Sequence, residues 1–174
     1  GADAFSLGSF QTGTTYTASD LTSGQAYYLK IKAVDFASMI PVANYEAFTY
    51  QYDTVAPTNP STISVTPTGY TATDNYDFLW AADVTDDYSG VVKFQYRTDG
   101  DALGVWVDID DPDAFQVTIP NADHLVGAYQ SGKNKFYLRA VDAAGNTSAS
   151  LMQEYYYSAS APTPPQNLTV TPST

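Results

Sequence analysis

The chain of 174 residues carries seven Lys and Arg residues against nineteen Asp and Glu residues, which gives a net charge of −12. A charge of this sign repels phosphate backbones and anionic lipids, so nucleic acid and membrane surfaces are poor partners. The absence of Cys excludes disulfides, thiolate metal ligands and a Cys nucleophile. Fifteen Tyr and eight Phe residues favour half-buried, pleated surfaces, and we expect an all-β protein.

An internal repeat organises the chain. Segment 28–35 (YLKIKAVD) returns as segment 135–142 (KFYLRAVD), 107 positions later, and the Pro-rich segment 56–60 (APTNP) returns as 161–165 (APTPP), 105 positions later. A period near 105 residues between Pro-rich joints is the length of one β-sandwich module. We therefore expect three parts: residues 1–55 as the C-terminal half of a module, 56–160 as a complete module, and 161–174 as the start of a third.

The first part, residues 1–55, lacks the strand pair that would hold the buried Trp of a complete module. A half-sandwich leaves apolar surface and strand edges uncovered. We expect upstream sequence, or strands donated by a neighbouring molecule, to cover them.

The complete module is expected to form seven strands, because short apolar runs alternate with turn residues along it. In the sixth of these strands Phe136, Leu138 and Ala140 alternate with Tyr137 and Arg139, the two-residue period of a strand with one face in the core. The expected strands are residues 61–66, 76–82, 91–98, 105–109, 114–119, 135–142 and 152–158.

Several segments resemble known modules. Residues 21–27 (LTSGQAY) and the strand after them resemble the fibronectin type III signature, in which Leu, Gly and Tyr precede the sixth strand. Trp80 and Tyr96 stand where that family places its core Trp and Tyr, so we expect Trp80 to pack near Tyr96, Phe136 and Leu138. Segments 87–91 (DYSGV) and 142–146 (DAAGN) resemble bacterial immunoglobulin-like repeats.

This resemblance covers almost the whole chain. It implies an all-β fold of tandem seven-stranded antiparallel β-sandwich modules of the fibronectin type III or immunoglobulin-like kind, with the first module incomplete. It also implies no active site. The resemblance is specific for the fold and weak for function, because such sandwiches host many unrelated roles.

The residues themselves offer no catalytic constellation. His124 is the only His, it lies in an expected turn, and no Ser has a recognisable nucleophile context near it. Acidic loops are more often solvated surface than paired catalytic carboxylates. We therefore expect a protein that is not an enzyme.

Acidic residues gather in segments that share one end of a sandwich of this type: the incoming linker and the loops after the second, fourth and sixth strands. At short separations like charges repel, and a hard dication with oxygen ligands relieves the repulsion. We expect a Ca²⁺ site at the joint before the complete module, with solvated acidic turns as the alternative. Its expected ligands come from Asp53, Asp83, Asp86, Asp87, Asp142 and Asn146. Asp110, Asp111 and Asp113 lie at the same end, in a segment without the Gly and Glu of an EF-hand loop.

A function follows from this architecture as an expectation. Sandwiches joined by short Pro-rich linkers act as semi-rigid spacers. We expect a structural or adhesion repeat of a secreted or cell-surface protein, whose partners are neighbouring modules of its own polypeptide, other cell-surface proteins or glycans. The alternative is an accessory module of a secreted polysaccharide-degrading enzyme, in which Trp106 and the run Tyr155–Tyr157 form a sugar-stacking platform rather than cross-strand packing.

Targeting signals are not visible in this sequence. No apolar run approaches the roughly 18 residues that span a bilayer, and Gly1 opens no leader of signal-peptide type. For an extracellular protein we expect the signal and the anchor to lie outside this segment.

Overall fold

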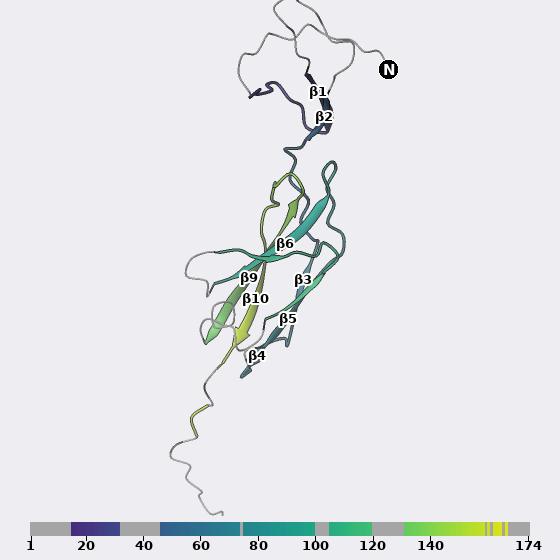
Figure 1. Ribbon diagram of the computed structural model, residues 1–174. Coiled ribbons are helices and arrows are strands. Elements are labelled where there is room, and N and C mark those ends of the chain that lie inside the picture. Colours follow the sequence, from purple (N-terminus) through teal and green to yellow (C-terminus); the bar gives the residue numbers. More distant parts are fainter. Residues whose placement is uncertain are drawn as a thin grey trace, which may run out of the picture. The chain divides into compact units, whose positions relative to one another are not determined.

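The computed structural model describes residues 15–31, 46–73, 75–99, 105–119, 131–158, 160, 162–164 and 166. The chain divides into two compact units, Gly1–Asp53 and Thr54–Thr174 (Figure 1). His124 and nearly all of the expected third module lie outside the described residues. Within the described ranges, no helix is long and apolar enough to cross a membrane.

The described strands of the first unit form an antiparallel hairpin of β1 (Gln25–Ile31) and β2 (Glu46–Tyr52). The hydroxyl of Tyr27, a residue of β1, accepts a hydrogen bond from the backbone N–H of Thr22, which precedes the strand, and donates one to the Thr22 carbonyl oxygen. A Tyr hydroxyl bonded to backbone a few residues upstream is the tyrosine corner of β-sandwich domains. The hairpin leaves large apolar side chains exposed, among them Tyr28 and Phe48.

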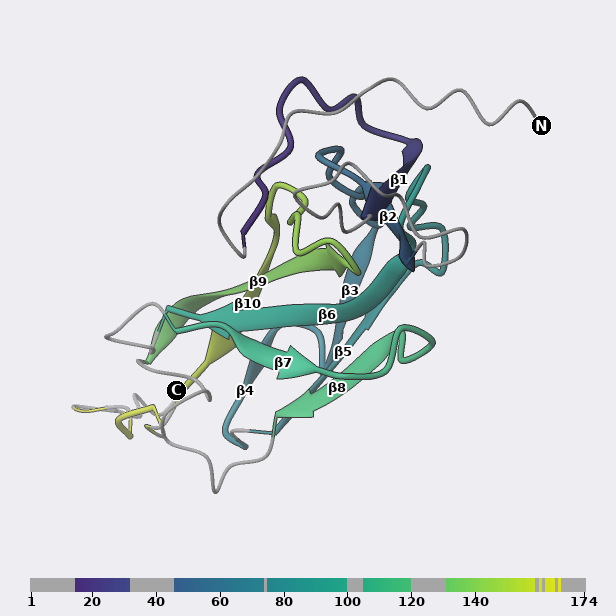
Figure 2. The same ribbon diagram turned by 45° about the horizontal axis from the view of Figure 1, so that its top comes forward.

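The second unit packs two sheets face to face (Figure 2). One sheet has the order β4 (Tyr70–Thr71), β10 (Leu151–Tyr157), β9 (Gly132–Asp142), β6 (Val91–Thr98) and β7 (Val107–Ile109). The other has the order β3 (Ile63–Thr66), β5 (Tyr76–Trp80) and β8 (Gln116–Ile119). The pairs are antiparallel except for β4 with β10. The expected β-sandwich is confirmed, and the short strand β4, which the sequence did not predict, extends its larger sheet.

Strand β9 shows how the sequence builds this arrangement. Phe136, Leu138 and Ala140 are fully buried, whereas the residues between them are half-exposed, as the alternation predicts. Asn134 continues the inward row and is also buried; its side-chain amide donates a hydrogen bond to the Gly132 carbonyl oxygen at 3.2 Å. A buried amide needs such a partner, because an unpaired polar group in the core costs free energy.

The core is a cluster of aromatic rings between the sheets. Phe78 of β5 stacks on Phe136 of β9 with ring centroids 3.9 Å apart and planes within 8°. Trp80 is 5% exposed, so its predicted burial is confirmed, but its neighbouring ring is Phe94, at 5.3 Å. Tyr155 is 2% exposed and packs edge-on against Phe78, so it belongs to the core, and the alternative that included it in a sugar-stacking platform does not hold for this residue.

Shortening Trp80 tests this core. Trp80→Ala should lower the free energy of unfolding by roughly 3 to 5 kcal/mol, because it removes a buried ring and leaves a cavity. Trp80→Phe is the matched control: the indole Nε1 has no hydrogen-bond partner within the described part of the chain, so Phe keeps most of the apolar contact and removes an unpaired donor. Urea titrations of the three proteins should rank wild type and Trp80→Phe well above Trp80→Ala. Equal midpoints for all three would contradict the placement of Trp80.

Candidate functional site

Two loops of the second unit meet at one end of the sandwich. Residues 81–90 join β5 to β6, and residues 143–150 join β9 to β10. Because β6 and β9 are neighbours, with Val91 opposite Asp142, the end of the first loop lies beside the start of the second. The Ala143 backbone N–H donates a hydrogen bond to the Gly90 carbonyl oxygen at 3.0 Å, which ties one loop to the other.

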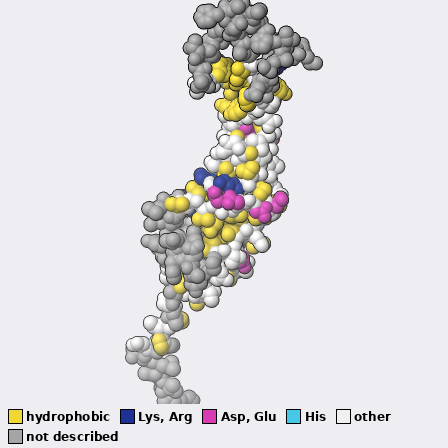
Figure 3. Space-filling view, in the orientation of Figure 1, with side chains coloured by type: hydrophobic (Ala, Val, Ile, Leu, Met, Phe, Trp, Pro, Cys, Tyr) yellow, Lys and Arg dark blue, Asp and Glu magenta, His cyan; other side chains and the backbone are white. Residues whose placement is uncertain are grey.

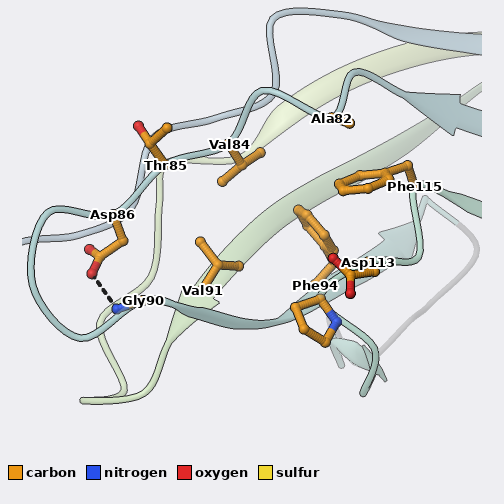
Figure 4. Close-up of a pocket in the computed structure, with 10 residues that line it drawn as sticks. Ala82, Val84, Thr85, Asp86, Gly90, Val91, Phe94, Asp113 and Phe115 are labelled. Atoms are coloured by element: carbon orange, nitrogen blue, oxygen red, sulfur yellow. Dashed lines mark hydrogen bonds between the residues drawn. The ribbon is translucent and has the colours of Figure 1, made fainter.

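Asp86 is held by the backbone of its own loop. Its Oδ2 accepts hydrogen bonds from the N–H groups of Tyr88, Ser89 and Gly90 at 3.1, 2.8 and 2.7 Å; Figure 4 draws the last of these. Gly90 closes the turn with φ of +79°, a conformation that favours glycine. The second carboxylate oxygen, Oδ1, is buried and has no hydrogen-bond partner among the described residues. The loop therefore fixes one oxygen of Asp86 and leaves the other available.

Asp142, at the end of β9, is 2% exposed. Its Oδ1 accepts a hydrogen bond from the Asn146 backbone N–H at 2.8 Å, and its Oδ2 accepts one from the Asn146 side-chain amide at 2.8 Å. Gly145 makes this tight return possible with φ of +92°. The Asn146 amide also lies 3.4 Å from the Val55 carbonyl oxygen, so it joins the linker to the loop. As placed here, Asn146 orients Asp142 through its nitrogen atoms.

Asp86 and Asp142 bring carboxylate oxygens within 4.8 Å of each other. At an effective dielectric constant near 20, two unit charges at that distance repel by roughly 3 kcal/mol. A dication between them would convert the repulsion into attraction, and carboxylate oxygens are the ligands that Ca²⁺ prefers. The pair could therefore hold a metal ion.

The other expected ligands have different surroundings. Asp53 is the last residue of the first unit, where its Oδ1 accepts a hydrogen bond from the Ser23 hydroxyl at 3.2 Å. Asp83 is exposed, and its Oδ1 accepts a hydrogen bond from the Ser61 backbone N–H at 3.0 Å. Hydrogen bonds from Ser61 hold the pKa of Asp83 below its usual value. Asp87 is exposed.

Asp110, Asp111 and Asp113 are exposed, and Asp111 Oδ1 caps the Asp113 backbone N–H at 2.9 Å. Asp113 lines an open hollow of about 420 Å³ that also reaches Asp86 (Figure 4). Its lining is mixed, with apolar side chains such as Val84 and Val91 beside the carboxylates of Asp86 and Asp113. The candidate metal site is the Asp86–Asp142 pair, because its carboxylate oxygens lie within 4.8 Å of each other.

Sequence reasoning missed a second feature, the outer face of the five-stranded sheet. The residues of β6 and β9 that alternate with the core carry Lys and Arg, and Figure 3 shows basic side chains gathered on one side of the second unit beside acidic ones. Trp106 and Tyr137 lie within cation–π distance of Arg97, at 5.3 and 4.5 Å. The sequence did contain a signal for this face: Lys and Arg residues stand at the positions between the buried residues of each strand.

Asp83 gives a pH-dependent prediction. Because its folded pKa is lowered, the charged group contributes stability that is present above its unfolded pKa and is lost as the pH falls through the folded pKa. Asp83→Asn should therefore lower the melting temperature slightly at pH 7, and the difference from wild type should shrink below about pH 4. Calorimetric melting at several pH values checks this, with Asp87→Asn as the control for the same change in charge. A difference that stays constant down to pH 2.5 would contradict the role of the Ser61 hydrogen bond.

No protein-family model matches the chain, and no curated protein matches it. Among solved structures, it is similar to fibronectin(III)-like modules of Clostridium thermocellum CbhA, at 13% identity and a TM-score of 0.46, over 79% of this chain and 64% of that one. It is also similar to the FN1–FN3 domains of chicken CNTN1, at 15% identity and a TM-score of 0.47, over 81% and 46% of the two chains. The chain thus spans less than two thirds of the length of either structure. The strand order itself shows that the second unit is an all-β sandwich of two packed sheets.

Proposed function

We propose that the chain is a non-catalytic spacer or adhesion repeat of a larger secreted or cell-surface protein, with a joint between modules that calcium stiffens. The observation that carries the proposal is the Asp86–Asp142 pair, since it places two carboxylates together at the end of the sandwich where the linker enters. A charge pair of this kind costs stability unless something compensates it. In this proposal, bound calcium compensates the repulsion between the two carboxylates.

The linker supports the spacer role, because it is fastened to the second unit along its length. Pro60 is fully buried and Pro57 is buried. The Thr58 backbone N–H donates to the Thr85 carbonyl oxygen at 2.8 Å, and the Thr85 N–H donates to the Thr58 hydroxyl at 2.8 Å. Each Pro restricts its own φ angle, and the hydrogen bonds of Thr58 hold the backbone between the two Pro residues, so the segment behaves as part of the module. A spacer needs this, because a free linker would let successive modules swing.

The proposed calcium ligands are one oxygen of Asp86, one of Asp142 and the carboxylate of Asp53. Asp53 is included because it precedes Val55 by two residues, and Val55 is held against Asn146. Ca²⁺ takes six to eight oxygen ligands, so water and backbone carbonyls would complete the shell. Asp83 and Asp87, which the sequence also suggested, serve in this proposal as nearby negative charge. Neighbouring modules of the same polypeptide are the partners that such a joint would connect.

Calcium titration tests the proposal. A cation bound only by the folded protein stabilises it by about 2.7 kcal/mol at 100 times its Kd, so calcium should raise the melting temperature of wild type and chelator should lower it. Asp86→Asn should abolish the effect, because an amide oxygen can still accept the loop hydrogen bonds but carries no charge. Asp53→Ser should weaken calcium binding.

The matched control is Asp87→Asn, which makes the same change in charge in the same loop and should retain the calcium response. Isothermal calorimetry and melting curves with calcium or chelator measure both quantities. If wild type takes up no calcium and its melting curves coincide in the two conditions, the acidic end is only solvated surface.

A second candidate function is the accessory module of a secreted polysaccharide-degrading enzyme. The observation that favours it is the set of rings on the outer face of the larger sheet: Trp106, Tyr137 and Tyr156 are half-buried, each with part of its surface open. Tyr156 packs on Tyr70 with ring centroids 5.2 Å apart. Aromatic side chains in such positions provide apolar surface to which sugar rings can bind.

A further inference from the structure

Positive charge is confined to one face of the second unit. This unit contains five Lys and Arg residues against fourteen Asp and Glu residues. All five lie on β6 and β9, at positions that alternate with the buried core: Lys93, Arg97, Lys133, Lys135 and Arg139. The carboxylates of the same sheet that lie outside the core are Asp108 and Glu154. A strongly acidic unit therefore presents a face on which cations outnumber anions; we call it the basic face.

Hydrogen bonds organise part of the basic face. Lys93 Nζ lies 2.7 Å from Asp108 Oδ2, and the Gln95 side-chain amide donates to Asp108 Oδ1 at 2.6 Å. Arg139 Nε donates to the Gln95 amide oxygen at 2.8 Å. These bonds run across three neighbouring strands, β7, β6 and β9, and hold the side chains in defined positions. An ordered surface loses less conformational entropy when it binds a ligand.

Two guanidinium groups on this face stack on rings. Arg139 lies 4.1 Å from the centre of the Trp106 ring, and Arg97 lies 4.5 Å from that of Tyr137. Arg97 Nε is buried and has no hydrogen-bond partner within the described ranges. Stacking occupies the face of a guanidinium group and leaves its edge for a planar anion. Since Arg139 Nε is bonded to Gln95 and Arg97 Nε is buried, the terminal Nη groups are the donors that an anion would use. Burial, and next the charge of Arg97, lower the pKa of Arg139.

We propose that the basic face binds a carboxylated polysaccharide, with uronate carboxylates on Arg97 and Arg139 and sugar rings against Trp106 and Tyr137. This rests on the second candidate function and names its ligand class. A guanidinium fork matches a carboxylate in two parallel hydrogen bonds. The acidic remainder of the unit opposes densely charged polyphosphates and nucleic acid, whereas a uronate polymer carries at most one charge per sugar and offers apolar ring faces between the charges.

The test measures binding of the whole 174-residue chain to polygalacturonate by calorimetry. The fully methyl-esterified form of this polymer has the same backbone without charge, and we expect it to bind the protein at least tenfold more weakly than polygalacturonate does. Arg97→Gln should weaken binding to polygalacturonate about tenfold, whereas Lys30→Gln, which makes the same change in charge on β1, should leave the affinity within a factor of two. Melting curves confirm that both variants fold. Binding should also weaken as salt is raised, because an exposed ion pair is screened.

A second measurement does not depend on any variant. Amide NMR shifts of wild type on adding oligogalacturonate should concentrate in β6, β7 and β9 and leave β3, β5 and β8 unchanged. Equal binding of the acid and the ester would overturn the carboxylate inference while keeping the carbohydrate-binding candidate. Binding of neither would overturn both. Two other results would also overturn the proposal. One is binding of dextran sulfate with the same affinity as polygalacturonate, with Arg97→Gln and Lys30→Gln affecting it alike. The other is formation of salt-sensitive dimers that cover the basic face without any sugar.

Discussion

Stacking of Phe78 on Phe136 joins the two sheets of the second unit, and the remaining geometry depends on it. With ring centroids 3.9 Å apart, this contact brings the middle of β5 against the middle of β9, and Tyr155, Tyr96 and Trp80 pack around it. Apolar burial of this extent is the main source of stability in a domain without disulfides. Once these side chains point inward, the two-residue period of each strand forces their neighbours outward. The buried core and the basic face are therefore two sides of the same strands.

The same pairing explains why Asp86 and Asp142 meet. They are 56 positions apart in the sequence, yet β6 and β9 are adjacent in the sheet, and Val91 faces Asp142 across the ladder. Each carboxylate is fixed by backbone N–H groups of its own loop, and each loop is closed by a glycine with positive φ. Burying an acidic group costs free energy unless hydrogen bonds compensate for it, so the local turns make a close pair of carboxylates tolerable.

Charge is segregated on this unit by strand and by loop. The Lys and Arg residues lie at outward positions of two central strands, whereas most carboxylates lie in loops at or beyond the strand ends. The two proposed roles consequently use different parts of the molecule: calcium would act at the loops and stiffen a joint, and an acidic glycan would lie on the sheet. A module of this kind could hold its neighbours at a set distance and contact a polymer along its side. Neither role requires a catalytic group.

The sequence alone determined the fold class, because the alternation in segment 135–142 depends only on local periodicity. That alternation is confirmed, and so is the burial of Trp80 that the resemblance implied. The sequence also suggested that acidic loops share one end, since loop positions follow from strand order. The sequence could not select Asp86 from the acidic residues of its loop, because the choice depends on which carboxylate the backbone N–H groups of the folded turn bind. It also could not separate Tyr155 from the two Tyr residues after it, because consecutive Tyr residues look alike in a sequence and only packing against β5 decides which of them is buried. The basic face also needed the tertiary structure, because its cations lie on strands separated by more than 30 residues that only the sheet brings together.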